Sequence, residues 1–239
     1  QTFMQLVKNF TGEHLPPAVE DIEKLLNRNR IFRDRTEGIG VISHDEANAW
    51  SITGPVARAS GVKQDLRKDQ AYLCYADNWD GSGASAVDFK VAIATGGDVL
   101  ARYLVRLEEI KQSAHIIDQL IERIPGGPIS VNDDGKINLP DKTAVYGSIE
   151  GLIHHFELVM TNRGWEAPVA EAYAANETAN GELGFYLVSD GGPRPWRAKC
   201  RPPSFINYQV FAKMVEGHLL ADIVAILGSL NVIAAELDR

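Results

Sequence analysis

Four charged residues recur at helical spacing in the middle of the chain. Asp98, Arg102, Arg106 and Glu109 are separated by four, four and three residues, which places them on one face of a helix. Acids and bases on one face can form a ladder of exposed ion pairs, each contributing about 0.3–0.5 kcal/mol. The same spacing also fits a polar stripe that is buried against another subunit. The second interpretation makes these four residues candidate interface or buried polar residues.

A second group of charges follows a loop that contains two glycines. The segment Gly54–Gly61 includes Arg58 and is followed by Asp65-Leu66-Arg67-Lys68-Asp69. Such a composition is common in exposed loops, but glycine also permits a close backbone approach where a loop meets another surface. We therefore add Arg58, Asp65 and Arg67 to the candidate interface or buried polar residues.

The histidines and cysteines are poorly spaced for metal binding. His154 and His155 are adjacent, so on a helix their side chains point about 100° apart. Cys74 and Cys200 are the only cysteines, whereas an iron–sulfur cluster needs about four ligands, and we expect both to be reduced thiols. The sequence also lacks Gly-rich phosphate loops and the common hydrolase and metalloprotease motifs. We expect no catalytic residue, no metal site and no cofactor bound by this chain.

The polar stripe requires a long helix to carry it. Apolar residues recur with a 3.6-residue period between Asp98, which can cap the helix, and Ile124, after which Pro125-Gly126-Gly127-Pro128 ends it. A helix from 98 to 124 is about 40 Å long. Because a small sheet cannot bury a helix of this length, we expect a bundle, with a partner helix from about Thr143 to Thr161.

The remaining segments predict an α+β chain. We expect a short helix over His44–Trp50 with Ser43 as its N-cap, an irregular stretch over residues 51–96, and a loop over 129–141 that turns at Asp133-Asp134-Gly135. The later elements are three strands at Val169–Asn176, Leu183–Ser189 and Trp196–Arg201, with a turn at Asn180-Gly181, and two helices at Phe211–Val215 and Leu219–Leu227. This order predicts a helical bundle with a long central helix over 1–165, then a small antiparallel sheet and C-terminal helices over 166–239.

Composition excludes some classes of function. The formal net charge is −8, and an acidic chain repels phosphate backbones, so we expect no nucleic-acid partner. No apolar run reaches 18 residues, the length of a membrane-spanning helix. The first residues, Gln1 to Val7, contain no turn signal before an apolar stretch, and we expect the chain to be part of a longer polypeptide.

Several blocks of sequence together resemble one family over nearly the whole chain. They are Asn29-Arg30-Ile31-Phe32 with Arg35-Thr36-Glu37-Gly38-Ile39-Gly40; Thr53-Gly54-Pro55 through Arg58-Ala59-Ser60-Gly61 with Asp65-Leu66-Arg67-Lys68; Gly97-Asp98 with Arg102-Tyr103-Leu104-Val105-Arg106 and Glu109; Gly181-Glu182-Leu183-Gly184 with Val188-Ser189-Asp190-Gly191; Pro195-Trp196-Arg197-Ala198-Lys199 with Arg201; Gly217-His218 with Ala221-Asp222; and Asp238-Arg239. The set resembles the 49-kilodalton (D-type) subunit of respiratory complex I, a relative of the large subunit of nickel–iron hydrogenases.

The resemblance implies a subunit of NADH:quinone oxidoreductase that helps form the quinone-reduction chamber. It implies a peripheral position on the cytoplasmic face of the inner membrane, beside a neighbouring subunit that carries the terminal iron–sulfur cluster. Quinone is then the substrate of the complex and not a cofactor of this chain. The family's quinone-headgroup histidine and tyrosine belong to an N-terminal part that these residues do not include.

The C-terminal tail departs from the family pattern. The resemblance implies that Asn231 and Ile233 are quinone-binding residues of the cavity wall. However, Asn231 stands where the family usually has aspartate, Ile233 where it usually has valine, and Ala235 where it usually has glycine. A true hydrogenase large subunit is disfavoured because its cysteine pair would fall in Ser229–Arg239. Two alternatives stay open: a non-redox assembly or interaction module, and the equivalent subunit of a ferredoxin-dependent quinone reductase.

Overall fold

The computed structural model describes residues 2–81, 83, 85–124, 126–127, 138–160, 167–192 and 194–238. The chain divides into two compact units that do not follow chain order. Unit 1 consists of Gln1–Ile124, Ala175–Leu183 and Arg201–Arg239, and unit 2 of Pro125–Ala174 and Gly184–Cys200. The expected boundary at 165/166 therefore falls inside unit 2. The expected turn at Asp133-Asp134-Gly135 lies outside the described residues.

Unit 1 begins with a nearly continuous helical run that is interrupted by one wide turn. The helices α1 (Phe3–Asn9) and α2 (Leu15–Leu26) are joined by a π-helix, η1 (Phe10–His14). Two prolines follow at positions 16 and 17, which lack the backbone N–H of a regular helix. The wide turn accommodates them, since the N–H of Leu15 donates to the carbonyl of Phe10, five residues back.

The next helices are short and well capped. The helix α3 (Arg30–Asp34) starts where the Asn29 side chain accepts a hydrogen bond from the N–H of Phe32. The helix α4 (His44–Ala49) has Ser43 as its N-cap, as expected, and Glu46 completes a capping box by accepting from the Ser43 N–H.

The stretch from 51 to 96 is less irregular than expected. It contains the helices α5 (Gly54–Ala59) and α6 (Leu66–Asp69) and the 3-10 helix η2 (Leu73–Tyr75). The prediction was wrong for α5 because Gly-Pro was taken as a turn, whereas proline in the first turn of a helix is well tolerated. Residues 86–97 contain no helix or strand, as expected. They are tied to α7 by side-chain amides: the N–H of Asp88 donates to Gln119 and that of Lys90 to Gln112.

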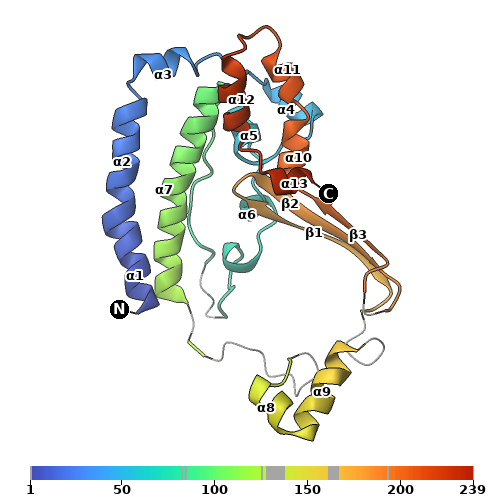
Figure 1. Ribbon diagram of the computed structural model, residues 1–239. Helices are drawn as coiled ribbons and strands as arrows, with labels where there is room; N and C mark the ends of the chain where they lie inside the picture. Colours follow the sequence, from blue (N-terminus) through green and yellow to red (C-terminus); the bar gives the residue numbers. More distant parts are fainter. Residues whose placement is uncertain are drawn as a thin grey trace. The chain divides into compact units, whose positions relative to one another are not determined.

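The long helix is present with the expected bounds. The helix α7 (Val99–Arg123) is capped by Asp98, whose carboxylate accepts from the N–H of Ala101. In Figure 1 the run from α1 to α2 lies alongside it, and a hydrogen bond from Thr11 to Asp118 and an ion pair between Lys111 and Glu23 join the two. Helices α5 and α12 cover its N-terminal half.

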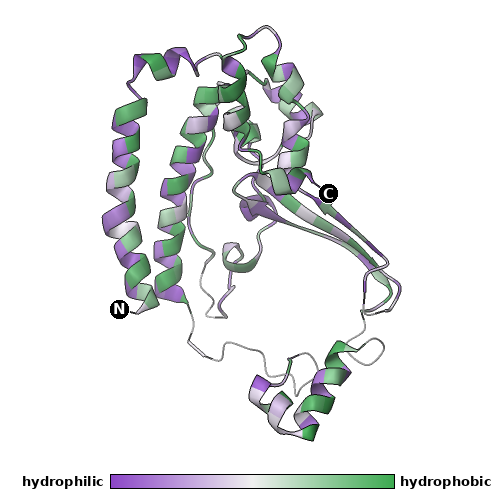
Figure 2. Cartoon of the chain, viewed as in Figure 1, coloured by the Kyte–Doolittle hydropathy of each residue, from purple (hydrophilic) through white to green (hydrophobic). Residues whose placement is uncertain are grey.

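The segment expected to pair with the long helix forms two helices instead of one. Residues 142–159 are divided at Ser148 into α8 (Lys142–Gly147) and α9 (Ile149–Val159), and both helices belong to unit 2. The prediction of one continuous helix was wrong at Ser148, whose backbone is extended and whose side chain caps α9 by accepting from the N–H of Gly151. The pairing with α7 stays a prediction. Figure 2 shows the apolar character of α9, whose exposed side chains include Ile149, Leu152, Ile153, Phe156 and Val159.

One antiparallel sheet and four helices complete the fold. The strands β1 (Ala170–Thr178), β2 (Gly181–Ser189) and β3 (Arg197–Arg201) are in the order β1-β2-β3. The helices that follow are α10 (Pro203–Tyr208), α11 (Phe211–Val215), α12 (Asp222–Leu230) and α13 (Ala234–Leu237). The chain is therefore α+β, as expected.

The main core of unit 1 joins residues from opposite ends of the chain. Its buried members are Ile42, Ala47, Ile52, Val56, Ala57, Val62, Val99, Val210, Met214, Ile226 and Leu230. Burial of an aliphatic side chain of this size contributes roughly 1.5–3 kcal/mol, so α4, α5, α7, α11 and α12 are held together chiefly by this cluster. Within the described ranges, no helix has both the length and the apolar character needed to cross a bilayer.

Candidate functional site

Arg58 lies at the centre of a buried charged cluster in unit 1. Its side chain is 1% exposed and donates from Nε and Nη2 to one carboxylate oxygen of Glu109, at 3.0 and 2.7 Å. Its Nη1 donates to Glu177 at 2.7 Å and to the carbonyl of Gln64 at 3.1 Å. Arg58 thus joins α5 to α7 and to the end of β1.

Arg67 forms the second pair of this cluster. Its Nε and Nη2 donate to the two carboxylate oxygens of Asp65, at 2.9 and 2.7 Å. The guanidinium also lies over the ring of Phe89, 4.7 Å from its centroid, which is a cation–π contact. Asp65 is itself 3.7 Å from the Arg58 guanidinium. We refer to Arg58, Asp65, Arg67, Glu109 and Glu177 as the Arg58 cluster.

Burial and ion pairing compete in the Arg58 cluster. Burial acts to lower the pKa of Arg58, but attraction by Glu177 and Glu109 outweighs it and the pKa is raised. Burial likewise opposes the pairing of Asp65 with Arg67, yet the pKa of Asp65 is lowered. For Glu177 burial wins, because its pKa is raised despite the charge of Arg58.

The four residues of the predicted polar stripe have separate partners. Asp98 is buried and accepts hydrogen bonds from the N–H groups of Ala101 and Gly38. Glu109 pairs with Arg58 of α5 and not with its neighbours along α7. This differs from a ladder of surface ion pairs, because the acids turn toward backbone donors and another helix.

Arg102 is fully buried and binds three other segments. Its exposure is 0%, and it donates to the carbonyls of Gly97 and Gly40 at 2.7 and 2.9 Å and to Ser229 Oγ at 2.9 Å. Burial, together with the charge of Arg106, lowers its pKa to about 9 against the attraction of Asp98. Arg102 therefore positions the loop before α4, the start of α7 and the end of α12.

Arg106 has a different environment. Its Nη1 lies 3.4 Å from the carbonyl of Arg102, while Nε and Nη2 are buried and have no hydrogen-bond partner among the described residues. Burial lowers its pKa, and Arg58 adds to that effect while Glu109 opposes it.

A cavity of about 530 Å³ adjoins Arg106 and the Arg58 cluster. Its charged and polar lining residues include Arg58, Arg67, Arg106, Glu109, Glu177 and Asn231. Its apolar wall comprises Phe10, Leu15, Ile110, Ala114 and Ile117. Sites for small organic ligands typically have this character, with an apolar wall and a few convergent polar groups.

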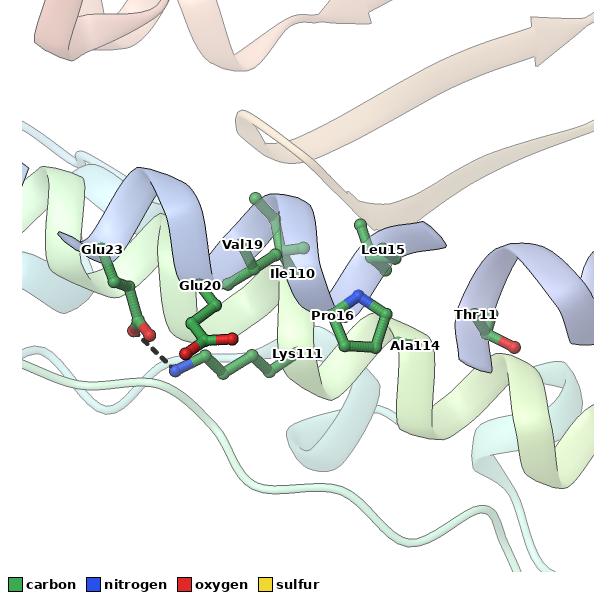
Figure 3. A pocket seen from close by; sticks show the side chains of 9 residues that line it. All are labelled: Thr11, Leu15, Pro16, Val19, Glu20, Glu23, Ile110, Lys111 and Ala114. Atoms are coloured by element: carbon green, nitrogen blue, oxygen red, sulfur yellow. Dashed lines mark hydrogen bonds and ion pairs between the residues drawn. The ribbon is translucent and has the colours of Figure 1, made fainter. Parts of the chain in front are cut away.

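A second cavity of about 270 Å³ lies between the helical run of residues 11–23 and α7. Figure 3 shows Val19 next to Ile110 and Pro16 next to Ala114 of α7, with the ion pair of Lys111 and Glu23 at one end. It holds none of the predicted site residues.

Asn231 stands at the turn that ends α12 and borders the large cavity. Its backbone is left-handed, with φ 54° and ψ 49°, which asparagine tolerates better than most residues. Its side-chain amide donates to Asn180 at 2.6 Å. Asn180 is buried in turn, and its carbonyl accepts from Asn207 at 3.2 Å.

Ile233 is separated from the cavity, although it follows Asn231 by only two residues. Its side chain is 46% exposed and is not part of the cavity wall. Its N–H lies 3.4 Å from Ser204 Oγ. The structure therefore brings Asn231 together with Arg58, Arg67, Arg106 and Glu109, but not Ile233.

Sequence reasoning missed Glu177, Asn180, Asn207 and Ser229. Glu177 carries no signal of its own, because it is one polar residue at the end of a strand. Asn180 was identified only as a turn residue. Among the described residues, no group of three His, Cys, Asp or Glu side chains is placed to hold a metal ion.

Comparison with known proteins places the chain in one family. The family model for the respiratory-chain NADH dehydrogenase 49 Kd subunit matches residues 1–239. The D-type subunit of the NADH-quinone oxidoreductase of Methylacidiphilum infernorum is 46% identical over 233 residues, which cover 98% of this chain and 53% of that protein. Its counterpart in Leptospira biflexa is 48% identical over 224 residues, which cover 94% of this chain and 52% of that protein.

A third relative shows the same similarity. The C/D-type subunit of the NADH-quinone oxidoreductase of Bdellovibrio bacteriovorus is 47% identical over 222 residues, covering 93% of this chain and 38% of that protein. The chain thus spans about half the length, or less, of the curated relatives that it matches. On the match of the family model to every residue, this chain belongs to the family of the 49 Kd subunit of respiratory-chain NADH dehydrogenase.

Proposed function

We propose that this chain forms part of the wall of the quinone-reduction chamber in an NADH:quinone oxidoreductase. Membership of the family supports the reaction class. The observation that supports the site is the cavity of unit 1, which Asn231 borders together with an apolar wall from η1, α2 and α7. A quinone ring is flat and weakly polar, so it suits an apolar cavity with few polar groups.

Asn231 and Ile233 have different tasks in this proposal. Asn231 offers neutral hydrogen-bonding groups and avoids the desolvation cost of a carboxylate. The exposed Ile233 offers apolar surface to the part of the quinone that lies beyond the cavity. In this proposal the chain binds and orients the quinone and excludes water from it. The electrons come from the iron–sulfur cluster of the neighbouring subunit. In the membrane-bound complex the chain is a peripheral subunit at the cytoplasmic face.

The test is Ile233→Met in the complete membrane complex. Because Ile-to-Met swaps usually cost under about 1.5 kcal/mol, we expect normal assembly with a several-fold change in the KM for quinone and in sensitivity to quinone-site inhibitors. Ile22→Met, at a similarly exposed position on α2, is the matched control and should leave both values unchanged.

Two results would reject the proposal. An unchanged KM and inhibitor sensitivity in fully assembled Ile233→Met complex would mean that the tail only packs. Turnover with reduced ferredoxin but not with NADH would assign the chain to the ferredoxin-dependent reductase instead.

A further inference from the structure

The first helical run of unit 1 exposes a stripe of large apolar side chains. Phe3, Leu6 and Phe10 are separated by three and four residues, the spacing of the apolar seam in a coiled coil. Their side chains are 75%, 53% and 51% exposed. The helix α1, all of which the structure describes, contains no buried residue. Since a helix usually buries the apolar face that this spacing produces, the element that covers the stripe is not among the described residues.

The long helix carries a matching stripe. Ile110, Ile117 and Ile124 follow one another at intervals of seven residues along α7 and its C-cap, which keeps them on one face. Ile110 and Ile124 are exposed and Ile117 is partly buried. This stripe is about 20 Å long, or roughly four turns of a helix.

The two stripes face a common space. Phe10 and Ile117 line the same large cavity, and Figure 1 shows α1 beside the C-terminal part of α7. Thr11 and Lys8 hold the two helices together through Asp118 and Glu122, so these polar links leave the apolar residues unused. We refer to the exposed or cavity-lining apolar residues of both stripes as the apolar seam: Phe3, Leu6, Phe10, Ile110, Ile117 and Ile124.

We propose that an amphipathic helix from the rest of the same polypeptide packs against the apolar seam and completes a three-helix bundle with the α1–α2 run and α7. The chain covers 53% and 52% of its Methylacidiphilum and Leptospira relatives, so a comparable length of such a polypeptide lies outside these residues. Covalent attachment gives a segment of that part a high local concentration at the seam, which favours it over a separate molecule.

The undescribed residues of this chain are poorly suited to cover the seam. The longest undescribed segment, 128–137, has ten residues, whereas roughly four turns of a helix need about 14. Its sequence also predicts a turn at Asp133-Asp134-Gly135. The occupant is therefore a longer helix with apolar residues three and four apart.

The test uses photo-cross-linking in the full-length polypeptide within its assembled complex. A benzophenone amino acid, which keeps an apolar aromatic side chain, replaces Phe3 in one variant and Phe10 in another. Both probes should cross-link to one segment of the same polypeptide outside residues 1–239. The two attachment points should lie about seven residues apart, because a packed helix keeps the register of the seam. A probe at Gln5, which is exposed and outside the seam, is the matched control and should give a several-fold lower yield.

A second measurement uses substitutions. Leu6→Glu should lower the amount of assembled complex several-fold, because a carboxylate is costly to bury in an apolar contact. Gln5→Glu adds the same charge one position away and should leave the amount unchanged.

Several results would overturn the proposal. The probes could cross-link only to residues 1–239, to no peptide, or to a separate chain, which the larger mass of the product would reveal. Attachment points without a common register, or normal assembly of Leu6→Glu, would equally contradict a packed helix. The cross-links form without quinone, so their failure is distinguishable from an unchanged KM in Ile233→Met.

Discussion

Arg58 and Glu109 join α5 to α7 through two hydrogen bonds to one carboxylate oxygen, at 3.0 and 2.7 Å. Glu177 approaches the remaining terminal nitrogen of the same guanidinium from the end of β1. Three segments that are distant in the sequence therefore meet at one buried cation. This geometry determines how the site responds to substitution.

Arg58→Ala should destabilise the full-length polypeptide by about 3–5 kcal/mol, because removing one member of a buried ion pair leaves the others uncompensated. Arg58→Lys should recover little, since one ammonium cannot reach Glu109, Glu177 and the Gln64 carbonyl together. The control is Arg33→Ala, whose pair with Glu37 is about half exposed on both sides and should cost about 0–1 kcal/mol. Chemical unfolding measures both, and equal losses for Arg58 and Arg33 would contradict the assigned burial.

Gly54→Ala should block the contact between α5 and the hairpin turn. Gly54 has a φ of +72°, and an added Cβ would lie 2.4 Å from the Cα of Gly181. Gly38 has the same φ with nothing within 4 Å of its added Cβ, so Gly38→Ala carries the backbone strain alone, about 1–2 kcal/mol. Gly54→Ala should lose clearly more stability in thermal unfolding; equal losses would show that the close approach is not needed.

The lowered pKa of Glu46 predicts that the folded protein loses stability in acid. The Lys213 side chain and the Ser43 cap lower its pKa from 4.5 to about 2. Because the folded pKa is below the unfolded one, the contribution of Glu46 is fully present above about pH 4.5 and is lost as the pH falls through about 2. The stability difference between wild type and Glu46→Gln should therefore shrink across this window. Asp45→Asn, in the same helical turn but fully exposed, is the control, and an equal trend there would refute the assignment.

Asn231 allows its backbone and side-chain roles to be separated. Asn231→Gly keeps the left-handed turn without strain, whereas Asn231→Ala adds about 1–2 kcal/mol of backbone cost. Both remove the amide that donates to Asn180. If the amide faces quinone, both variants should shift the KM for quinone equally. Both should also lose the stability of the hydrogen bond to Asn180, and Asn231→Ala should lower the unfolding temperature further because of its backbone strain. A KM shift in Ala alone would mean that the turn, and not the amide, matters.

Sequence reasoning succeeded where the information is local. The long helix, the capped helix at His44 and the strands around Asn180-Gly181 follow from period, caps and turn residues that act within a few positions. It failed where the outcome depends on distant partners. The apolar period of residues 143–161 predicted a helix but not its unit, and the spacing of Arg102 could not reveal that its acceptors are Gly40, Gly97 and Ser229.

The candidate site shows the same division. Arg58, Asp65, Arg67, Arg106, Glu109 and Asn231 were singled out beforehand, and all but Asp65 line one cavity, which Asp65 adjoins through Arg67. Glu177 was missed because its only signal is its charge, and its role arises from a tertiary contact 119 residues away along the chain. The resemblance alone pointed to Asn231, since no residue pattern around it indicates a binding role.

The division of unit 1 into three sequence segments has a consequence for biosynthesis. Arg102 is separated from Ser229 by 127 positions, and Gly40 from His218 by 178. A nascent chain must therefore add all of unit 2 before α12 can reach α7, and contacts of such high sequence separation form slowly. Until then the apolar faces of α5 and α7 remain uncovered, so we expect the newly made polypeptide to depend on chaperones more than its length alone would suggest.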